Sequence, residues 1–400
     1  MNSDLSSGLE LDEYSRYGRQ MLVPEIGLEG QLSFKESKVI VIGAGGLGCP
    51  CIAYLAGAGI GQLAIVDPDV VETSNLHRQV LHSEEGLNKA ESLRRFVSKL
   101  NPKIALDIYT CRLTTSNASI ISKYDIVVDC TDNVAARYLI NDICVLMNKP
   151  LVTASALRLE GQLTILNYKN GPCYRCLFPR PPAPELSTKC AESGVLGSVV
   201  GVLGTLQASQ VLKLLLNNCP KNSNKDDAYQ DSMILFSLFK FPQIKQVRIR
   251  PKQKDCQICS ADPLIKTLDP SNYEFPVCAI PSPANIQRIK AEELKNIQNS
   301  YNENETLLID CREPTQFGLC SLKNFLNIPY AAIQKARTKE ELKDLLPSNA
   351  ETKDIIVICR RGNDSILATE KLQDFGYKVK DVAGGLLSYS NDVDHTFPIY

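Results

Sequence analysis

The stretch Val39-Ile40-Val41-Ile42-Gly43-Ala44-Gly45-Gly46-Leu47-Gly48 decides the fold of the first half of the chain. Four consecutive apolar β-branched residues predict a buried strand, and the glycines predict a tight turn into a helix. Such a turn lets a phosphate group approach backbone N–H groups at the N-terminus of a helix. The sequence therefore predicts a nucleotide-binding unit in which Gly43, Gly45 and Gly46 lie against the nucleotide.

A regular alternation of apolar strands and helices continues from this unit to about residue 155. The rhythm predicts a parallel, doubly wound sheet with helices on both faces. The expected strands are 39–42, 63–66, 104–109, 126–129 and 151–152, and the expected helices are 46–58, 89–100 and 134–147.

The spacing changes after Gly161. Three further segments, 162–167, 233–238 and 244–249, predict antiparallel strands, and the long apolar stretch 195–216 between them predicts a helix. The polar stretch 217–231 predicts a loop. We therefore expect a mixed sheet in the first domain.

Five prolines between residues 262 and 283 predict an extended connection between two domains. We expect a nucleotide-binding domain over 1–261, a linker over 262–283 and a second α/β domain over 284–400. In the second domain the pattern predicts helices at 291–298 and 365–375 and strands at 307–310 and 355–358. The predicted fold class is thus α/β, a Rossmann-like domain followed by a smaller α/β domain.

The composition narrows the possible functions. The net charge of -1 gives no support for strong direct binding to nucleic acids or to a membrane surface. We expect no secretion signal and no apolar run of membrane-spanning length, and therefore a cytosolic protein. Fifteen cysteines in a cytosolic chain favour metal binding or thiol chemistry over disulfides, and only three histidines argue against a histidine-based catalytic site.

Asp67 ends the strand that follows the glycine loop, at the position where a carboxylate can bind ribose hydroxyls. The glycine loop and this carboxylate would describe an NAD-binding oxidoreductase equally well. The pattern alone leaves both kinds of nucleotide enzyme open.

Four cysteines form two Cys-x-x-Cys pairs, Cys173 with Cys176 and Cys256 with Cys259. Each pair can present two thiolates to one tetrahedral ion, and four thiolates are typical of a closed structural zinc site. We expect one Zn²⁺ per subunit, which would stabilise the fold of the first domain and take no part in catalysis.

Several motifs beyond the glycine loop occur in order: Arg16-Tyr17-Gly18-Arg19-Gln20, the stretch from Asp67 to Gln79, Lys89, and Asp129-Cys130-Thr131-Asp132-Asn133. With them, residues 12–260 resemble the ubiquitin-activating superfamily, in particular its adenylating members MoeB and ThiF. The resemblance implies that Asp67 holds the ribose of ATP and that Asn75, Arg78 and Lys89 bind its phosphates. It also implies that Asp132 binds Mg²⁺ and that Arg19 reaches the partner's nucleotide in a homodimer. The other residues expected to line the site are Ser74, Leu76, His77 and Asn133.

The residue types fit this chemistry. A carboxylate that attacks the α-phosphorus of ATP is repelled by the triphosphate unless cations neutralise the charge. Arg78 and Lys89 are cations of this kind, and the reaction needs no general base. The segment from His82 to Lys89 is shorter than the usual spacing of the family.

Cys190 lies in the polar stretch Ser187-Thr188-Lys189-Cys190-Ala191-Glu192, between the first cysteine pair and the long apolar helix. A thiol beside a lysine in a polar loop has the surroundings of a reactive nucleophile. In the family that the chain resembles, a cysteine at this place forms an acyl linkage or resolves a disulfide. We expect Cys190 to be catalytic.

A second cysteine loop, Cys359-Arg360-Arg361-Gly362-Asn363-Asp364-Ser365, connects a predicted strand to a predicted helix. Backbone N–H groups at the start of the helix and the two arginines would stabilise an anionic persulfide on Cys359. With Asp310-Cys311-Arg312-Glu313-Pro314 before it and Gly384-Gly385-Leu386 after it, this loop resembles the active loop of rhodanese domains. We expect Cys311 to be buried.

The order of the two domains resembles that of the fused enzymes that serve molybdopterin synthesis and tRNA thiolation in eukaryotes. The resemblance implies that ATP activates the C-terminal glycine of a small ubiquitin-like protein ending in Gly-Gly. A persulfide on Cys359, charged by a cysteine desulfurase or another sulfur donor, would then attack the activated acyl carbon. Reductive cleavage assisted by Cys190 would release the carrier as a thiocarboxylate.

Three alternatives remain open at the level of sequence. One is an NAD-dependent oxidoreductase with a fused thiol domain. Another is an activating enzyme that uses Cys190 alone to conjugate its modifier to other proteins. The third is a scaffold or sulfur sensor without turnover.

Overall fold

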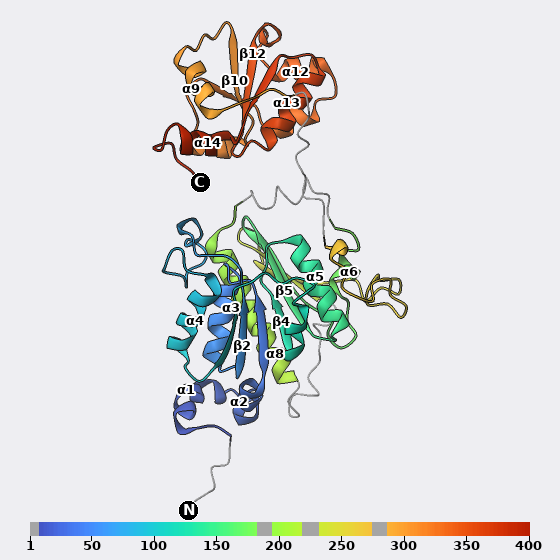
Figure 1. Cartoon of the computed structure of the whole chain (residues 1–400). Coiled ribbons are helices and arrows are strands. Elements are labelled where there is room, and N and C mark those ends of the chain that lie inside the picture. Colours follow the sequence, from blue (N-terminus) through green and yellow to red (C-terminus); the bar gives the residue numbers. More distant parts are fainter. Residues whose placement is uncertain (1–7, 182–193, 218–231, 274–285) are drawn as a thin grey trace, which may run out of the picture. The chain divides into compact units, whose positions relative to one another are not determined.

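The computed structural model describes residues 8–181, 194–217, 232–273 and 286–400. The chain divides into two compact units, Met1–Val277 and Cys278–Tyr400 (Figure 1), which are described separately below.

The first unit is built on an eight-stranded sheet with the strand order β3-β2-β1-β4-β5-β6-β7-β8. The first five strands along the chain pair in parallel, and β6, β7 and β8 add to them in antiparallel register. The predicted mixed sheet is confirmed. The strands are β1 Lys38–Ile42, β2 Gln62–Val66, β3 Ala105–Tyr109, β4 Ile126–Asp129, β5 Leu151–Leu157, β6 Glu160–Leu166, β7 Ser232–Ser237 and β8 Ile244–Arg248.

The strand β1 lies inside this sheet and is buried on both faces. Val39 and Val41 face one hydrophobic cluster, whereas Ile40 and Ile42 face another. The first cluster is formed with α2 Gly27–Glu36, α3 Gly48–Ala58, α4 Lys89–Leu100 and α8 Gly197–Asn217, and the second with η2 Ala118–Lys123 and α5 Val134–Leu146. This two-sided burial explains why β1 is an unbroken apolar run.

The helix α8 corrects one expectation. By length and composition its 21 residues could cross a membrane, contrary to our expectation that no apolar run reaches that length. More than half of its most apolar window is buried inside the first unit. Val199, Leu203 and Val211 lie in the same hydrophobic cluster as α3. In the fold, α8 is a core helix of this unit.

Two N-terminal helices were not predicted from the sequence. The helices α1 Leu11–Met21 and α2 cover the end of the sheet opposite to the glycine loop. The N–H group of Gly61, just before β2, donates to the carbonyl of Phe34 in α2 (3.0 Å), and the Tyr17 ring of α1 lies under Gly59 at the C-terminal end of α3. Gly59 has φ +85°, and a side chain there would collide with that ring.

The second unit contains a five-stranded parallel sheet with the order β11-β10-β12-β13-β9. The predicted strands and helices in this unit are present as β10 Thr306–Asp310, β12 Asp354–Ile358, α9 Ala291–Asn299 and α13 Asp364–Asp374. The shorter elements were not predicted: β9 Arg288–Ile289, α10 Pro314–Leu319, β11 Phe325–Asn327, α11 Tyr330–Lys335, α12 Lys339–Leu345, η5 Ala350–Thr352, β13 Val379–Val382 and α14 Gly385–Asp392.

The described part of the predicted linker, residues 262–273, belongs to the first unit. It contains η4 Pro270–Asn272, and the Tyr273 hydroxyl donates to the Asp142 carboxylate (3.0 Å). Residues 274–285 of the predicted linker lie outside the described residues. Where each domain begins and ends remains a prediction.

Candidate active sites

The glycine loop lies where the carboxyl ends of β1 and β4 meet. Gly43 has φ +102°, and a side chain at this position would lie 2.7 Å from the carbonyl oxygen of Cys130, the residue after β4. A side chain at Gly48 would lie 2.0 Å from the carbonyl oxygen of Gly43. Only glycine fits both positions, so the backbone can turn sharply from β1 into α3.

Asp67, the residue after β2, holds this loop in place. Its carboxylate accepts the N–H group of Ala44 (2.7 Å) and that of Asp69 (2.8 Å). Burial raises the pKa of Asp67, and the two N–H groups oppose that rise. The predicted ribose ligand is therefore also a structural anchor of the glycine loop.

Arg78 is brought to the same edge of the sheet by the segment that follows η1 Thr73–Asn75. Its guanidinium donates to the side-chain oxygen of Asn75 and lies 2.7 Å from Nε2 of His77. The backbone of Arg78 lies against Gly46, where an added side chain would meet its carbonyl oxygen at 3.3 Å. Arg78 and Asn75 thus lie beside the glycine loop, and their binding to the phosphates remains a prediction.

Lys89 is the first residue of α4 and is buried. Asn88 caps the helix and donates through its amide to the carbonyls of Asp67 and Asp69, each at 3.1 Å. The ammonium of Lys89 lies 3.2 Å from the Asp69 carboxylate. The short segment before Lys89 therefore does not displace it from the turn after β2.

Asp132 and Asn133 follow β4, next to the glycine loop. Asp132 is exposed, and Asn133 caps α5 by accepting the N–H group of Ala136 (3.1 Å). Among the other predicted residues in this group, Ser74 and His77 are exposed and Leu76 is half-buried. All belong to segments that leave the carboxyl ends of β2 and β4.

Within one chain, Arg19 lies far from the residues around the glycine loop. It is exposed in the last turn of α1, the helix that packs under Gly59 at the C-terminal end of α3. The glycine loop lies at the other end of α3, about 16 Å away for a helix of this length. An interaction of Arg19 with a nucleotide would need the nucleotide of another subunit, as expected from the family resemblance.

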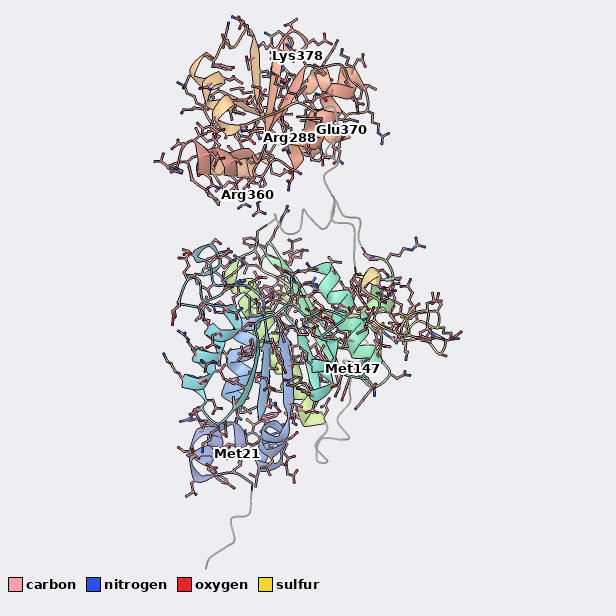
Figure 2. The ribbon with its side chains drawn as sticks, in the orientation of Figure 1. Met21, Met147, Arg288, Arg360, Glu370 and Lys378 are labelled. Carbon is pink, nitrogen blue, oxygen red and sulfur yellow. The ribbon has the colours of Figure 1, made fainter. Side chains whose placement is uncertain are left out.

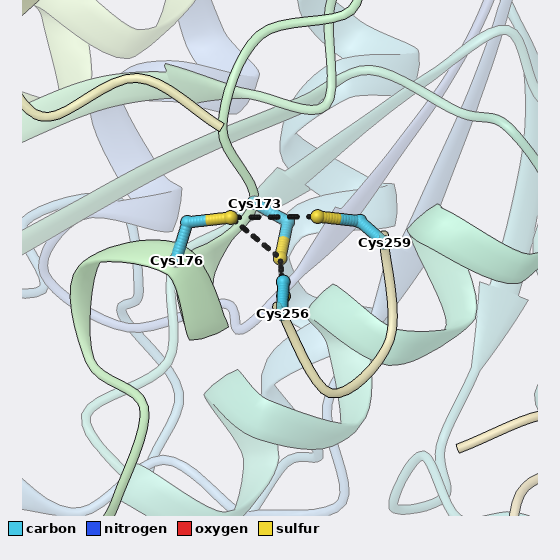
Figure 3. A group of neighbouring side chains, drawn as sticks. All are labelled: Cys173, Cys176, Cys256 and Cys259. Atoms are coloured by element: carbon cyan, nitrogen blue, oxygen red, sulfur yellow. Dashed lines mark hydrogen bonds between the residues drawn. The ribbon is translucent and has the colours of Figure 1, made fainter. Parts of the chain in front are cut away.

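The four predicted zinc ligands come together. Figure 3 shows the sulfurs of Cys173, Cys176, Cys256 and Cys259 pointing toward one centre, and all of them lie within 4.8 Å of one another. The Cys173 and Cys256 sulfurs are 3.5 Å apart, and the Cys176 and Cys259 sulfurs are 3.4 Å apart. A zinc ion with Zn–S bonds of about 2.3 Å needs sulfurs about 3.8 Å apart, so the donor set fits zinc.

Hydrogen bonds and a buried ion pair hold the backbone around these cysteines in place. Cys173 caps the N-terminus of the short helix α6 Tyr174–Leu177 and Cys176 lies within it, and the N–H group of Gln253 donates to the Cys176 sulfur (3.3 Å). Arg175 between them forms a buried ion pair with Asp142 of α5 (2.7 Å). The second cysteine pair is thereby attached to the middle of the first unit.

Cys359 follows β12 and begins the loop that enters α13. It is buried, and the N–H group of Gly362 donates to its sulfur (3.1 Å). Burial alone would raise the pKa of Cys359, but interactions with the Cys311 thiol and with the hydroxyl and N–H groups of Ser365 lower it to about 7. This cysteine is therefore partly ionised near neutral pH, as a sulfur acceptor requires.

The two flanking motifs meet this loop. The N–H group of Leu386 donates to the carbonyl of Cys359 (2.9 Å), and a side chain at Gly385 would lie 2.3 Å from the same oxygen. In the other motif, the N–H group of Cys311 donates to the carbonyl of Ile358, the residue before Cys359 (2.9 Å), and Arg312 is buried and paired with Asp310 (2.6 Å). The three predicted motifs of the second unit thus form one site.

The two loop arginines differ from each other. Arg361 is exposed, whereas the Arg360 guanidinium stacks on the ring of Tyr400 (4.7 Å). The carbonyl of Arg360 accepts the N–H group of Leu387 in α14 (3.0 Å), and Figure 2 labels Arg360 close to that helix.

Three residues of this site were missed at the sequence level. Cys311 was expected to be buried, which is confirmed, but its interaction with Cys359 was not foreseen. Ser365 is buried, and its hydroxyl has no partner of standard geometry among the described residues, so it can turn toward the sulfur. Arg288 donates to the carbonyl of Gly362 (3.1 Å) and to Asp381 (2.6 Å). Cys311 follows β10, Ser365 lies at the start of α13 and Arg288 lies in β9, so these residues come from distant parts of the sequence.

Cys190 lies in the segment 182–193, outside the described residues, and its catalytic role remains a prediction.

Models of two protein families match the chain. Residues 17–258 match the ThiF family, and residues 290–392 match the rhodanese-like domain.

Curated relatives match almost the whole chain. The adenylyltransferase and sulfurtransferase MOCS3 of Aedes aegypti is 44% identical, with 98% of this chain and 90% of the relative covered. The adenylyltransferase and sulfurtransferase UBA4 of Yarrowia lipolytica is 44% identical over 97% of this chain and 96% of the relative. The MOCS3 protein of Dictyostelium discoideum is 43% identical, with 98% of each covered.

Among solved structures, E. coli MccB crystallised with ATP is similar in fold, with a TM-score of 0.52 and 23% identity over 63% of this chain and 75% of that one.

Proposed function

The chain belongs to the ThiF family and carries a rhodanese-like domain, and on this premise we propose that it is an adenylyltransferase and sulfurtransferase that acts on a small ubiquitin-like protein. The observation that carries the proposal is the presence, on one chain, of the glycine loop with Asp67, Arg78 and Lys89 and of the ionisable Cys359.

The first step is adenylation. The C-terminal carboxylate of the carrier attacks the α-phosphorus of ATP, and pyrophosphate leaves. The N–H groups of the glycine loop and the cations of Arg78 and Lys89 neutralise the charge that repels the attacking carboxylate. We assign the ribose to Asp67, and Ser74, Asn75, Leu76, His77 and Asn133 to the lining of the site. Asp132 would hold Mg²⁺, which shields the phosphate charge when bound.

The second step is sulfur transfer. A sulfur donor, such as a cysteine desulfurase, places a sulfane sulfur on the Cys359 thiolate. The terminal sulfur of this persulfide attacks the activated acyl carbon, and AMP leaves with the electron pair of the acyl–oxygen bond. Reduction of the resulting acyl disulfide gives the carrier thiocarboxylate. We assign to Cys190 the second thiol that reacts with the carrier.

Zinc has a structural role in this proposal. Cys173, Cys176, Cys256 and Cys259 would hold one Zn²⁺ per subunit, closed to substrate, and the ion would stabilise the attachment of the second cysteine pair.

The membership in this family also suggests the pathways, the oligomeric state and the compartment of the enzyme. We propose that the thiocarboxylate serves tRNA thiolation, molybdopterin synthesis or both, and that the enzyme works as a homodimer in the cytosol, with Arg19 reaching the nucleotide of the partner. The carrier is recognised by its ubiquitin-like fold and Gly-Gly end.

Isotope exchange between ATP and pyrophosphate tests the adenylation step. We expect exchange that depends on a Gly-Gly-ended carrier and on Mg²⁺, because only a reversible acyl-adenylate returns labelled pyrophosphate to ATP. Cys359→Ala should leave the exchange intact, since sulfur enters later. Exchange without a carrier, or its absence with every such carrier, would contradict the proposal.

A further inference from the structure

Cys311 and Cys359 lie side by side in the second unit, although 48 positions separate them in sequence. They directly follow β10 and β12, which pair in parallel with Asp310 opposite Ile358 as the last pair. The N–H group of Cys311 donates to the carbonyl of Ile358 (2.9 Å), so the ladder extends to the two cysteines.

The two thiols face the same side of the sheet. Both are buried in one hydrophobic cluster, together with Ile309 and Val357 from the same strands. Neighbouring strands are about 4.8 Å apart, and a disulfide spans Cα–Cα distances of about 4.4 to 6.8 Å. The backbone therefore already places these cysteines at disulfide distance.

The proton is distributed unequally between them. Burial and the nearby Cys359 raise the pKa of Cys311, so that its thiol keeps the proton and acts as a donor to the Cys359 thiolate. When Cys359 carries a neutral acyl disulfide, this negative charge is gone and Cys311 loses its proton more easily. Cys311 is thus least reactive while the Cys359 sulfur is a free thiolate.

We propose that Cys311 is the resolving thiol of the sulfur site, which cleaves the acyl disulfide on Cys359 and releases the thiocarboxylate. The inference rests on the proposed function and names the source of the electrons for its last step. Cys311 is the only other cysteine in the described residues that contacts Cys359.

The step balances in atoms and electrons. Cys311 Sγ attacks Cys359 Sγ, a bond between these two sulfurs forms, and the bond from Cys359 Sγ to the sulfur of the carrier breaks. Cys311 loses its proton to solvent and attacks as a thiolate, and the carrier leaves as the thiocarboxylate anion, a good leaving group because its pKa is low. The two cysteine sulfurs are oxidised to a disulfide and the carrier sulfur is reduced. An external dithiol then reduces the disulfide for the next turnover.

A redox titration of the full-length protein tests the pairing. The protein would be equilibrated in mixtures of reduced and oxidised dithiothreitol, trapped by alkylation and mapped by peptide mass spectrometry. We expect a Cys311–Cys359 disulfide at the oxidised end, absent from Cys311→Val and retained in the matched control Cys320→Ser. Lack of this link in the wild type at the most oxidising ratio would overturn the proposal.

A second measurement determines the lifetime of a persulfide on Cys359. Reduced wild type and Cys311→Val would be loaded with inorganic polysulfide, freed of reagent and assayed for released sulfide. In the wild type, Cys311 attacks Cys359 Sγ and displaces hydrogen sulfide, so the persulfide of Cys311→Val should last at least about tenfold longer. Equal lifetimes would overturn the inference. Neither assay uses ATP or carrier, so failure here is distinct from failure of adenylation.

Discussion

At the scale of the residue, Lys89 is the cation whose position the sequence left least determined. It is buried at the start of α4, and its ammonium faces Asp69 beside the anchor of the glycine loop. A buried lysine needs a charged partner, and a single carboxylate leaves hydrogens of the ammonium group that can bind a phosphate.

Replacing Lys89 should therefore impair adenylation. We expect Lys89→Ala to slow carrier-dependent ATP–pyrophosphate exchange about 100-fold or more, because one preformed donor to the developing charge is lost. Lys99→Ala, an exposed lysine on the same helix, is the matched control and should keep normal exchange. Equal rates for the two variants would remove Lys89 from the site.

Ser365 provides a prediction on pH dependence. Its interactions with the Cys359 sulfur help to lower the pKa of that thiol to about 7, so the thiolate forms as the pH rises through that value. In Ser365→Ala the hydroxyl is lost, the pKa rises, and alkylation of Cys359 should begin at higher pH. The rate of iodoacetamide labelling of the Cys359 peptide as a function of pH measures this. An unchanged profile would show that the hydroxyl plays no part.

At the scale of the element, the cluster of four cysteines links a short helix to a distant loop. Cys173 caps α6 and Cys176 lies within it, while Cys256 and Cys259 come from a segment without helix or strand. Thiolate ligation of zinc contributes folding energy directly.

Loss of a ligand should thus release both metal and stability. We expect Cys256→Ser to contain less than one zinc per chain by elemental analysis and to melt at least about 5 °C below the wild type. Cys111→Ser, at an exposed cysteine outside the cluster, is the control and should keep both values. A variant that retains zinc and normal melting would contradict the assigned ligands.

Long, periodic elements were predictable from sequence, whereas short ones were not. The unbroken run of β1 and the pattern of α4 identify these elements because burial on defined faces fixes their residue types. The two-residue strand β9 exists only because β13 lies beside it. The contact of Cys311 with Cys359 was likewise hidden, since it depends on the register of β10 with β12.

The same distinction holds for the candidate sites. The glycine loop, Asp67 and the cysteine pairs are local motifs, and the structure brings each to its expected neighbours. The role of Arg19 depends on a second subunit and could come only from the family resemblance.

At the scale of the whole molecule, the position of Arg19 predicts an active site shared between subunits. We expect Arg19→Ala and Lys89→Ala each to be inactive in ATP–pyrophosphate exchange, because every site then lacks one cation. Mixed dimers of the two variants contain one site with both cations intact, so mixing and reassembly should restore part of the activity. Failure to recover any exchange in verified mixed dimers would place Arg19 outside the shared site.

The central claim is that a carboxyl terminus activated at the first unit receives the sulfur carried by Cys359 of the second. The most direct measurement is mass spectrometry of a Gly-Gly-ended ubiquitin-like carrier incubated with the enzyme, ATP, Mg²⁺, a sulfur donor and a reductant. We expect one C-terminal oxygen to be replaced by sulfur with the wild type and no replacement with Cys359→Ala. A carrier that is adenylated yet gains no sulfur, or gains it equally with Cys359→Ala, would contradict the account.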